Sequence, residues 1–213
     1  GIVGRLAAWL AGVPVIVHTY HSCVFRYRHL RPWQQRLFLW VERLAAPLTT
    51  HFIVISDALR QEFLDVGIAP SDRIETIYSG IDLEAFHGSM ARGGHRQTLG
   101  LTPEDVVIGS VARLDVGKGH EELLDALAQL TSRFPHAKLL CVGDGPLRRH
   151  LEARIRQLGL TDRVQLLGQR DDVPQLTQAF DIAVLASHYE GMGRVLLEAQ
   201  AAGKPVIAMN AGG

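Results

Sequence analysis

Short apolar runs alternate with amphipathic stretches along almost the whole chain. The runs are too short for helices and suit strands, whereas the stretches between them repeat apolar positions every three or four residues, as helices do. The expected strands are residues 14–18, 52–55, 73–78, 106–112, 138–142, 164–167, 181–186 and 205–208. Because most runs are apolar throughout, with few alternating polar positions, they predict parallel sheets covered by helices on both faces.

The stretches between the strands carry helix start and stop signals. Pro32 suits the first turn of one helix, whose apolar stripe continues to Leu44. Ser56 is a good N-cap for the next helix, and Gly67 can adopt the left-handed conformation that ends it. Later helices are expected at residues 121–134, before Gly159, at 173–179 and around Glu198.

One segment interrupts this alternation. Residues 87–105 are poor in large apolar side chains and rich in glycine and charge, which is typical of a domain boundary. We therefore expect one domain at residues 1–86, a linker region at 87–105 and a second domain at 106–213. In such doubly wound domains, ligands bind at the carboxyl ends of the strands.

Composition narrows the class of protein. The 213 residues are 47% hydrophobic and 21% charged, with 22 basic and 22 acidic side chains, so the overall charge does not suggest a nucleic-acid partner. Cys23 and Cys141 stand far apart, which fits a reducing cytoplasm better than a disulfide or zinc framework. The longest apolar run, residues 6–17, contains Gly12 and Pro14 and is too short to span a bilayer.

The balanced total hides a basic first segment. Residues 1–60 contain seven arginines and two acidic residues, and residues 25–44 add several aromatic side chains, including Trp33 and Trp40. Two interpretations stay open. The basic residues form a solvated face over a packed helix, or residues 25–44 make a peripheral contact with an anionic membrane surface.

Two cations follow the strand at 106–112. Arg113 and Lys118 share a loop with Gly117 and Gly119, and the glycines would let the backbone fold both side chains around one polyanion. Arginine grips phosphate oxygens with its planar fork, and lysine adds a mobile point charge. A diphosphate is the ligand that this pattern favours, and two solvated loop cations are the alternative.

The stretch EGMG, residues 190–193, leads directly into an apolar helix. Gly191 and Gly193 would let the backbone approach a ligand and expose amides at the N-terminus of the helix. Glu190 and Glu198 would lie on the order of 12 Å apart. That separation is too large for two carboxylates acting on one bond, and it suits a long ligand with a sugar at one end and a ribose at the other.

Several motifs together resemble a known family. EGMGRVLLEAQAAGKPVIA resembles the E-x7-E signature of the retaining glycosyltransferases of family 4, which have the GT-B fold. GSVARLDVGKGHEELLDAL resembles their Arg-x4-Lys segment. The stretches FIVISDALRQEF, YSGIDLEAF, VGDGPLRRHLE and DIAVLASHYEG are similar to further landmarks in the expected order. The resemblance covers nearly the whole chain and departs at residues 78–80, where family members commonly have Pro-Asn-Gly.

The resemblance implies an α/β fold with two Rossmann-like domains, each built on a parallel doubly wound sheet. It also implies that both domains are incomplete in this chain. We expect the glycine-rich loop of the family to precede residue 1 and the last helices of the second domain to follow Gly213. A fragment of this kind could be inactive by itself.

The resemblance also implies roles for particular residues. Arg113 and Lys118 would neutralise the donor diphosphate, and Glu198 would accept hydrogen bonds from the ribose. The transferred sugar would be held by Glu190 and the main chain of Gly191, Met192 and Gly193, with Gly143 and Gly145 as further substrate-binding positions. His21 would stand on the acceptor side near the reacting carbon, although a histidine in a polar loop is often structural.

The implied reaction moves a sugar from a UDP- or GDP-sugar to a carbohydrate or lipid-linked acceptor, with retention at the anomeric carbon. Its transition state would resemble an oxocarbenium ion, and the two cations would stabilise the leaving diphosphate. We therefore expect no metal and no other cofactor. We expect a cytoplasmic location, with the inner face of the membrane as an option.

Other functions stay open at this stage. A sugar-nucleotide epimerase or phosphorylase would share the fold, and a non-catalytic membrane-surface module would use the aromatic first segment. An NAD-dependent oxidoreductase is disfavoured, because Arg148 stands where the third glycine of the dinucleotide fingerprint belongs and no acidic residue ends the next strand.

Overall fold

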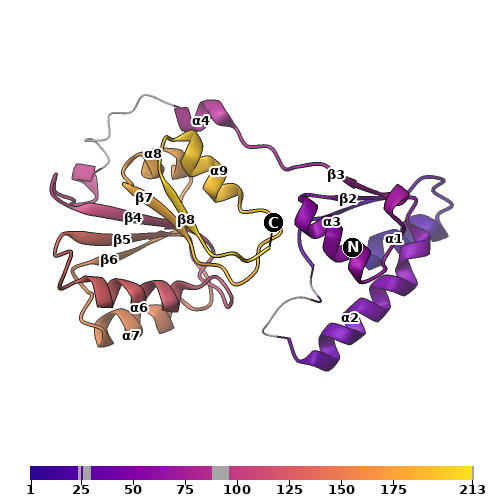
Figure 1. Cartoon of the computed structure of the whole chain (residues 1–213), viewed down its shortest axis with the longest axis horizontal. Coiled ribbons are helices and arrows are strands. Elements are labelled where there is room, and N and C mark those ends of the chain that lie inside the picture. Colours follow the sequence, from indigo (N-terminus) through magenta and orange to yellow (C-terminus); the bar gives the residue numbers. More distant parts are fainter. Residues whose placement is uncertain (24, 26–29, 88–95, 213) are drawn as a thin grey trace. The chain divides into compact units, whose positions relative to one another are not determined.

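A computed structural model describes residues 1–23, 25, 30–87 and 96–212 (Figure 1). The chain forms two compact units, each with its own parallel sheet. The first unit consists of Gly1–Gly80, Tyr189–Met192 and Ala211–Gly213, and the second of Ile81–His188 and Gly193–Asn210. The predicted domain limits, including the linker at 87–105, stay predictions, and residues 88–95 of that linker lie outside the described residues.

The first unit contains a three-stranded sheet in the order β1-β2-β3. The strands are β1 (Val17–Tyr20), β2 (His51–Val54) and β3 (Ile74–Thr76). The helical elements around them are α1 (Ile2–Leu10), α2 (Pro32–Ala45), η2 (Ala46–Leu48), α3 (Asp57–Asp65) and η3 (Ser71–Arg73). All strand pairs are parallel, as the apolar runs predicted.

Helix ends in the first unit follow the signals in the sequence. Pro32 occupies the first turn of α2, where a missing N–H leaves no hydrogen bond unmade. The Ser56 hydroxyl accepts a hydrogen bond from the Leu59 N–H at 3.2 Å and caps α3. Gly67, with φ of +62°, turns the chain after this helix.

The core of the first unit combines aromatic packing with a buried polar network. Tyr20 packs edge-on against Phe63, with ring centroids 4.5 Å apart. Its hydroxyl donates to the Glu42 carboxylate, which also pairs with the buried Arg5 guanidinium at 2.5 Å. This network joins α1, α2 and β1, so two helices and a strand are held together by one carboxylate.

The first strand differs from its predicted position. We expected a buried strand at 14–18, and β1 instead begins at Val17, which pairs with His51. Pro14 has no N–H to donate to a ladder, and Val15 and Val17 are more than half exposed. The prediction of a fully buried run was therefore wrong here, because β1 is an edge strand of its sheet.

The second unit contains a five-stranded parallel sheet in the order β6-β5-β4-β7-β8. Its strands are β4 (Val106–Val111), β5 (Ala137–Val142), β6 (Val164–Gly168), β7 (Ile182–Leu185) and β8 (Val206–Ala208). Its helices include α4 (Leu83–His87), α6 (His120–Leu130), α7 (Arg148–Gln157), α8 (Val173–Gln178) and α9 (Arg194–Ala201). The predicted α/β fold class with parallel sheets is confirmed.

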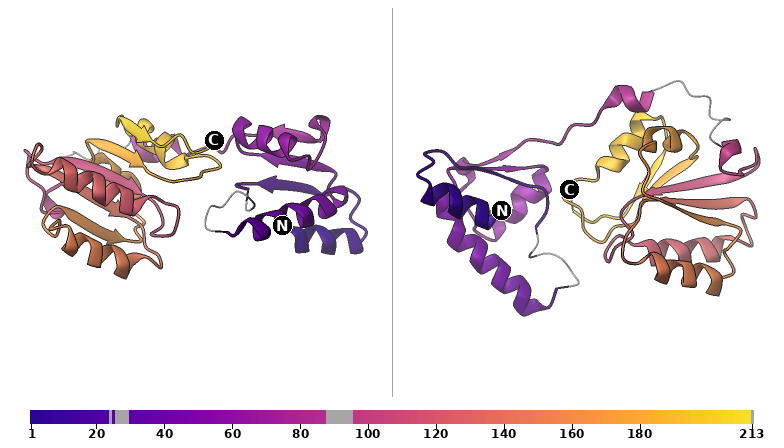
Figure 2. Two further views of the ribbon diagram at one scale, coloured as in Figure 1. Left: turned by 60° about the horizontal axis from the view of Figure 1, so that its bottom comes forward. Right: turned by 180° about the vertical axis from the view of Figure 1, so that it is seen from behind.

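Two apolar layers cover the faces of this second sheet. Figures 1 and 2 show α6 and α7 on one face, with α8 and α9 on the other. Along β5, Leu139 and Cys141 belong to the cluster with α6 and α7, whereas Leu140 and Val142 belong to the cluster with α8 and α9. Because alternate side chains of a strand point to opposite faces, one continuous apolar run fills both layers.

The strand order places a switch point between β4 and β7. The chain runs from β4 outward through β5 to β6 and then returns to β7 on the other side of β4. The helices that follow β4 and β7 therefore lie on opposite faces of the sheet, and the carboxyl edge between them is where open α/β sheets bind ligands. Arg113 and Lys118 follow β4, and the segment from Ser187 to Gly193 follows β7.

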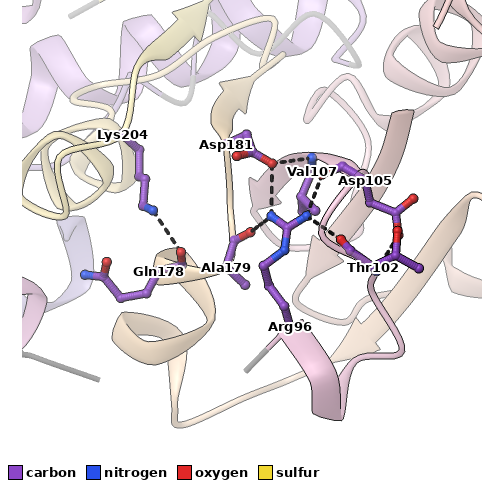
Figure 3. A network of polar contacts seen from close by, with 8 residues as sticks. All are labelled: Arg96, Thr102, Asp105, Val107, Gln178, Ala179, Asp181 and Lys204. Carbon is purple, nitrogen blue, oxygen red and sulfur yellow. Dashed lines mark hydrogen bonds and ion pairs between the residues drawn. The ribbon is translucent and has the colours of Figure 1, made fainter. Parts of the chain in front are cut away.

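A buried arginine secures the opposite end of this sheet (Figure 3). Arg96 donates hydrogen bonds to the carbonyls of Ala179, Thr102 and Asp105 and to the Asp181 carboxylate. Asp181 also accepts from the Val107 N–H at 2.8 Å. The segment before β4 and the segment before β7 are thereby joined at their amino ends.

Within residues 1–23, 25, 30–87 and 96–212, no helix combines the length and the apolar character needed to cross a bilayer.

Candidate functional site

The loops that follow β4 and β7 touch each other at the carboxyl edge of the second sheet. A Cβ at Gly119 would lie 1.9 Å from the Ala186 carbonyl oxygen, so only glycine fits at this position. Gly119 also has φ of +71°, a conformation that glycine adopts without strain. The His188 N–H donates to the Gly117 carbonyl at 2.8 Å. The β4–α6 loop and the β7–α9 loop therefore form one connected surface.

The β4–α6 loop presents its two cations from a buried anchor. Leu114 is fully buried, and its main chain exchanges hydrogen bonds with Asp144 and Leu147 in the next loop. Arg113 beside it is exposed, with Nε 3.4 Å from an Asp115 carboxylate oxygen. A buried, hydrogen-bonded loop base with an exposed guanidinium is suited to gripping an anion from solvent.

Gly143 and Gly145 allow the β5–α7 loop to pack against the β4–α6 loop. A Cβ at Gly143 would lie 2.2 Å from the Ala112 oxygen, and one at Gly145 would lie 2.3 Å from the Leu114 oxygen. Their glycine character is thus explained by loop packing below Arg113. The predicted contact of these two residues with substrate stays a prediction.

Glu198 belongs to α9, on the other side of the switch point. Its carboxylate is mostly buried and lies 3.8 Å from the Arg194 guanidinium, one helical turn earlier. With Thr177, Phe180 and other residues it lines a small cavity. Gly193 precedes the helix, and a Cβ there would lie 2.9 Å from Leu185. The helix that carries Glu198 is therefore packed closely against the end of β7.

Two buried polar side chains at the same edge were missed by the sequence reasoning. His120 is 4% exposed and Ser187 is 1% exposed, and the Ser187 hydroxyl has no hydrogen-bond partner in the described part of the chain. Burial lowers the pKa of His120 below its ordinary value of 6.5, and the Lys118 charge acts in the same direction. His120 directly follows the Lys118–Gly119 pair, and this proximity was the available signal.

The segment from Tyr189 to Met192 belongs to the first unit. The Tyr189 hydroxyl donates to Glu62 at 2.9 Å and accepts from the Cys23 N–H at 3.3 Å. The Ser56 hydroxyl donates to the Gly191 carbonyl at 2.7 Å. These hydrogen bonds hold residues 189–191 against the rest of the first unit.

His21 and Gly191 lie side by side in the first unit. A Cβ at Gly191 would lie 2.0 Å from the His21 carbonyl oxygen, so the EGMG main chain passes directly over the loop after β1. Glu190 donates its N–H to the Ala211 carbonyl at 2.8 Å, and Met192 packs against the core cluster. The predicted acceptor-side histidine and the predicted sugar-binding segment are thus neighbours.

The structure therefore groups the predicted site residues in two sets. In the first unit are His21, Glu190, Gly191 and Met192, and in the second unit are Arg113, Lys118, Gly143, Gly145, Gly193 and Glu198. The individual roles assigned to these residues stay predictions.

Two parallel Rossmann-like sheets, with cations and glycines on loops at a switch point, are typical of α/β proteins that bind phosphorylated ligands. Comparison with known proteins narrows this class. Residues 92–213 match the family described as "Glycosyl transferases group 1", and residues 1–85 match "Glycosyltransferase Family 4". The chain belongs to the group 1 glycosyl transferases, whose model matches more than half of it. Its fold is the GT-B fold.

Individual relatives agree with the family. The chain is 34% identical over 217 residues to the UDP-Gal:alpha-D-GlcNAc-diphosphoundecaprenol alpha-1,3-galactosyltransferase of Escherichia coli, covering 100% of this chain and 56% of that protein. It is 34% identical to the putative glycosyltransferase EpsF of Bacillus subtilis, covering 95% and 53%. The crystal structure of Anabaena HepE in complex with UDP-glucose is 32% identical, with a TM-score of 0.85 and coverage of 100% and 57%. The chain thus spans about half the length of these relatives.

Proposed function

We propose that the protein containing this chain transfers a sugar from a UDP- or GDP-sugar to a carbohydrate or lipid-linked acceptor. The observation that carries this proposal is the arrangement at the switch point of the second unit. There, the loop with Arg113 and Lys118 follows β4, and the helix with Glu198 follows the neighbouring β7. The E. coli relative is named for the donor UDP-Gal, and the Anabaena structure holds UDP-glucose, which supports a nucleotide sugar as the donor.

In this proposal, the second unit binds the donor nucleotide. Arg113 and Lys118 neutralise the diphosphate, because a guanidinium and an ammonium on a glycine-rich loop can both reach its oxygens. Glu198 accepts hydrogen bonds from the ribose hydroxyls. Glu190 and the main chain of residues 191–193 hold the transferred sugar, and His21 stands at the acceptor side.

The proposed reaction retains the configuration at the anomeric carbon. The bond from that carbon to the diphosphate breaks, the leaving oxygen gains negative charge, and the two cations stabilise that charge as it develops. The sugar passes through an oxocarbenium-like state before it bonds to the acceptor oxygen, whose proton passes to the departing diphosphate. Since the cations meet the electrostatic demand of the leaving group, we propose that no metal ion or other cofactor takes part.

The test is a screen of the full-length protein with UDP- and GDP-sugars, measuring the release of UDP or GDP with and without acceptors. Lys118→Ala should lower kcat/KM for transfer, because it removes about 2 to 4 kcal/mol of transition-state stabilisation. Lys138→Ala is the matched control, because that ammonium donates to the Asp162 carbonyl on a different edge of the sheet. Equal kinetics for both variants would remove Lys118 from the site.

The nucleotide-release screen and a thermal-protection assay separate the alternative enzymes. An epimerase or phosphorylase of this fold would release the nucleotide with water or phosphate as the acceptor, without transfer to a glycan. An oxidoreductase would be protected against heat by NAD and not by UDP or GDP, since a ligand that binds the native state raises its apparent stability.

A peripheral membrane contact at the cytoplasmic face is a second proposal, and α2 supports it. Trp33 and Trp40 are 58% and 59% exposed, and Leu37 and Leu44 are also exposed. Arg36 adds an exposed positive charge on the same helix. Tryptophan beside arginine suits the boundary between lipid headgroups and acyl chains. Of the proposed contact segment 25–44, residues 26–29 lie outside the described residues.

Vesicle sedimentation tests this contact. The full-length protein should bind vesicles with anionic lipid more tightly than neutral vesicles, and Trp33→Ser with Trp40→Ser should weaken that binding. Equal sedimentation of this double variant and the unchanged protein would favour a solvated face.

A further inference from the structure

His188 connects the two loops of the candidate donor site through two separate contacts. Its N–H donates to the Gly117 carbonyl at 2.8 Å. Its ring Nε2 lies 2.6 Å from a carboxylate oxygen of Glu122, in the first turn of α6. His188, in the β7–α9 loop, thus contacts the β4–α6 loop at Gly117 and contacts α6 at Glu122.

Lys118 lies between these two points of attachment. Gly117 and Gly119 flank it, with φ of +83° and +71°, and a Cβ placed on Gly117 would meet no described atom within 4 Å. Glycine restricts the backbone little, so the two flanking glycines by themselves leave the path of the chain through Lys118 open to several conformations. Within the loop, the Lys118 N–H donates to the Asp115 carbonyl at 3.2 Å. His188 adds a contact from outside the loop on each side of Lys118.

We propose that His188 is a positioning residue for the donor diphosphate, acting through the main chain of Lys118. This inference rests on the proposed function, because Lys118 is the residue assigned to the diphosphate. The histidine and the carboxylate are 32% and 60% exposed, so solvent screens the pair and its effect is modest. Breaking it should weaken nucleotide binding about twofold to fivefold, while the fold persists.

The experiment measures the dissociation constants of UDP and of GDP, and the KM and kcat for the accepted donor, in the full-length protein. His188→Ala and Glu122→Ala should each raise the dissociation constant about twofold to fivefold. The double variant should have the same dissociation constant as either single variant, because all three variants lose the same His188–Glu122 contact. His188→Gln should restore binding, since its amide N–H reaches about as far as the ring Nε2.

A neighbouring pair provides the matched control. His150 Nε2 lies 3.3 Å from a Glu121 carboxylate oxygen, so this pair joins the first turn of α6 to α7 and does not touch the β7–α9 loop. His150→Ala removes the same kind of side chain. Glu121→Ala removes the same negative charge from the same helical turn. Both control variants should bind UDP and GDP within about 1.5-fold of the unchanged protein.

Three outcomes overturn the inference. It fails if His188→Ala matches His150→Ala, if His188→Gln is as impaired as His188→Ala, or if the His188 and Glu122 effects add in the double variant. Lys118→Ala, measured alongside, separates this failure from that of the proposed function. If Lys118→Ala binds normally, the diphosphate assignment itself is wrong, whereas a defect in Lys118→Ala with normal binding in His188→Ala refutes only the role of His188.

Discussion

Arg96 and Asp181 form an ion pair in the second unit, with Nη1 and Oδ2 3.0 Å apart and the guanidinium 8% exposed (Figure 3). They come from segments 85 residues apart in sequence, one leading to β4 and the other to β7. The pair therefore joins the amino ends of the two strands whose carboxyl ends carry the candidate donor loops.

Replacing Arg96 should destabilise the second unit severely. Arg96→Met leaves the Asp181 carboxylate and three carbonyls without the donor that serves them, and breaking a buried pair on one side costs about 3 to 5 kcal/mol. Urea unfolding followed by circular dichroism measures this loss. Arg170→Met, which breaks the exposed pair with Asp172, should change stability little. A similar midpoint for both variants would contradict the structural role of Arg96.

Two glycines of one loop should respond differently to alanine. Gly117 and Gly119 both have positive φ, so alanine at either should cost about 1 to 2 kcal/mol of backbone strain. Only at Gly119 does the new methyl also collide with the Ala186 carbonyl. Gly119→Ala should therefore lose clearly more stability than Gly117→Ala and should also weaken UDP or GDP binding. Thermal unfolding and calorimetric titration measure the two effects, and equal losses would show that the loops separate without cost.

Glu198→Ala should weaken nucleotide-sugar binding by about 1.5 to 3 kcal/mol, because a carboxylate that accepts ribose hydroxyls forms charge-assisted hydrogen bonds. Titration with UDP or GDP measures the change. Glu152→Ala is the control, since that carboxylate pairs with Arg148 on the surface of α7. Loss of affinity in both variants alike would point to a general charge effect and not to ribose recognition.

His120 should make the protein less stable as the pH falls below about 6.5. Burial lowers its pKa in the folded protein, so above 6.5 the residue is neutral in both states and contributes no pH dependence. As the pH falls, the unfolded chain takes up a proton that the native state refuses, and stability drops by up to about 1.4 kcal/mol per pH unit until the lowered native pKa is reached.

His120→Gln should flatten this dependence. Urea unfolding at about pH 7.5 and about pH 5.5 compares the slopes, and any constant loss of stability from the substitution cancels in that comparison. The same replacement at the exposed His136 controls for the removal of a histidine. An unchanged slope in His120→Gln would mean that the imidazole is already solvated in the native state.

Much of the fold was predictable because its signals are local. A run such as residues 138–142 can satisfy its apolar side chains only between two layers, and the structure places β5 at Ala137–Val142 between such layers. The cap at Ser56 and the stop at Gly67 also act within a few residues of their own positions. The start of β1 was predicted less well, because pairing with His51 decides it and the apolar character of residues 14–16 does not.

The candidate site was predictable in its residue types and less so in its supports. Arg113 and Lys118 stand out because they follow a strand in a loop with two glycines, and Glu198 stands out through its eight-residue spacing from Glu190. Neither His188 nor His120 stands out in the same way. The role proposed for His188 depends on the Glu122 carboxylate, 66 residues away in sequence. The lowered pKa of His120 depends on its burial in the folded chain.

The sequence by itself determined the alternation of strands and helices, the parallel sheets and the positions of the charged loops, since periodicity and glycine placement act over a few residues. The tertiary structure alone decided which of those loops touch, that Gly119 must lack a Cβ because Ala186 faces it, and that Arg96 and Asp181 close the far end of the sheet. The physical reason is that burial and pairing depend on groups brought together only when distant segments pack.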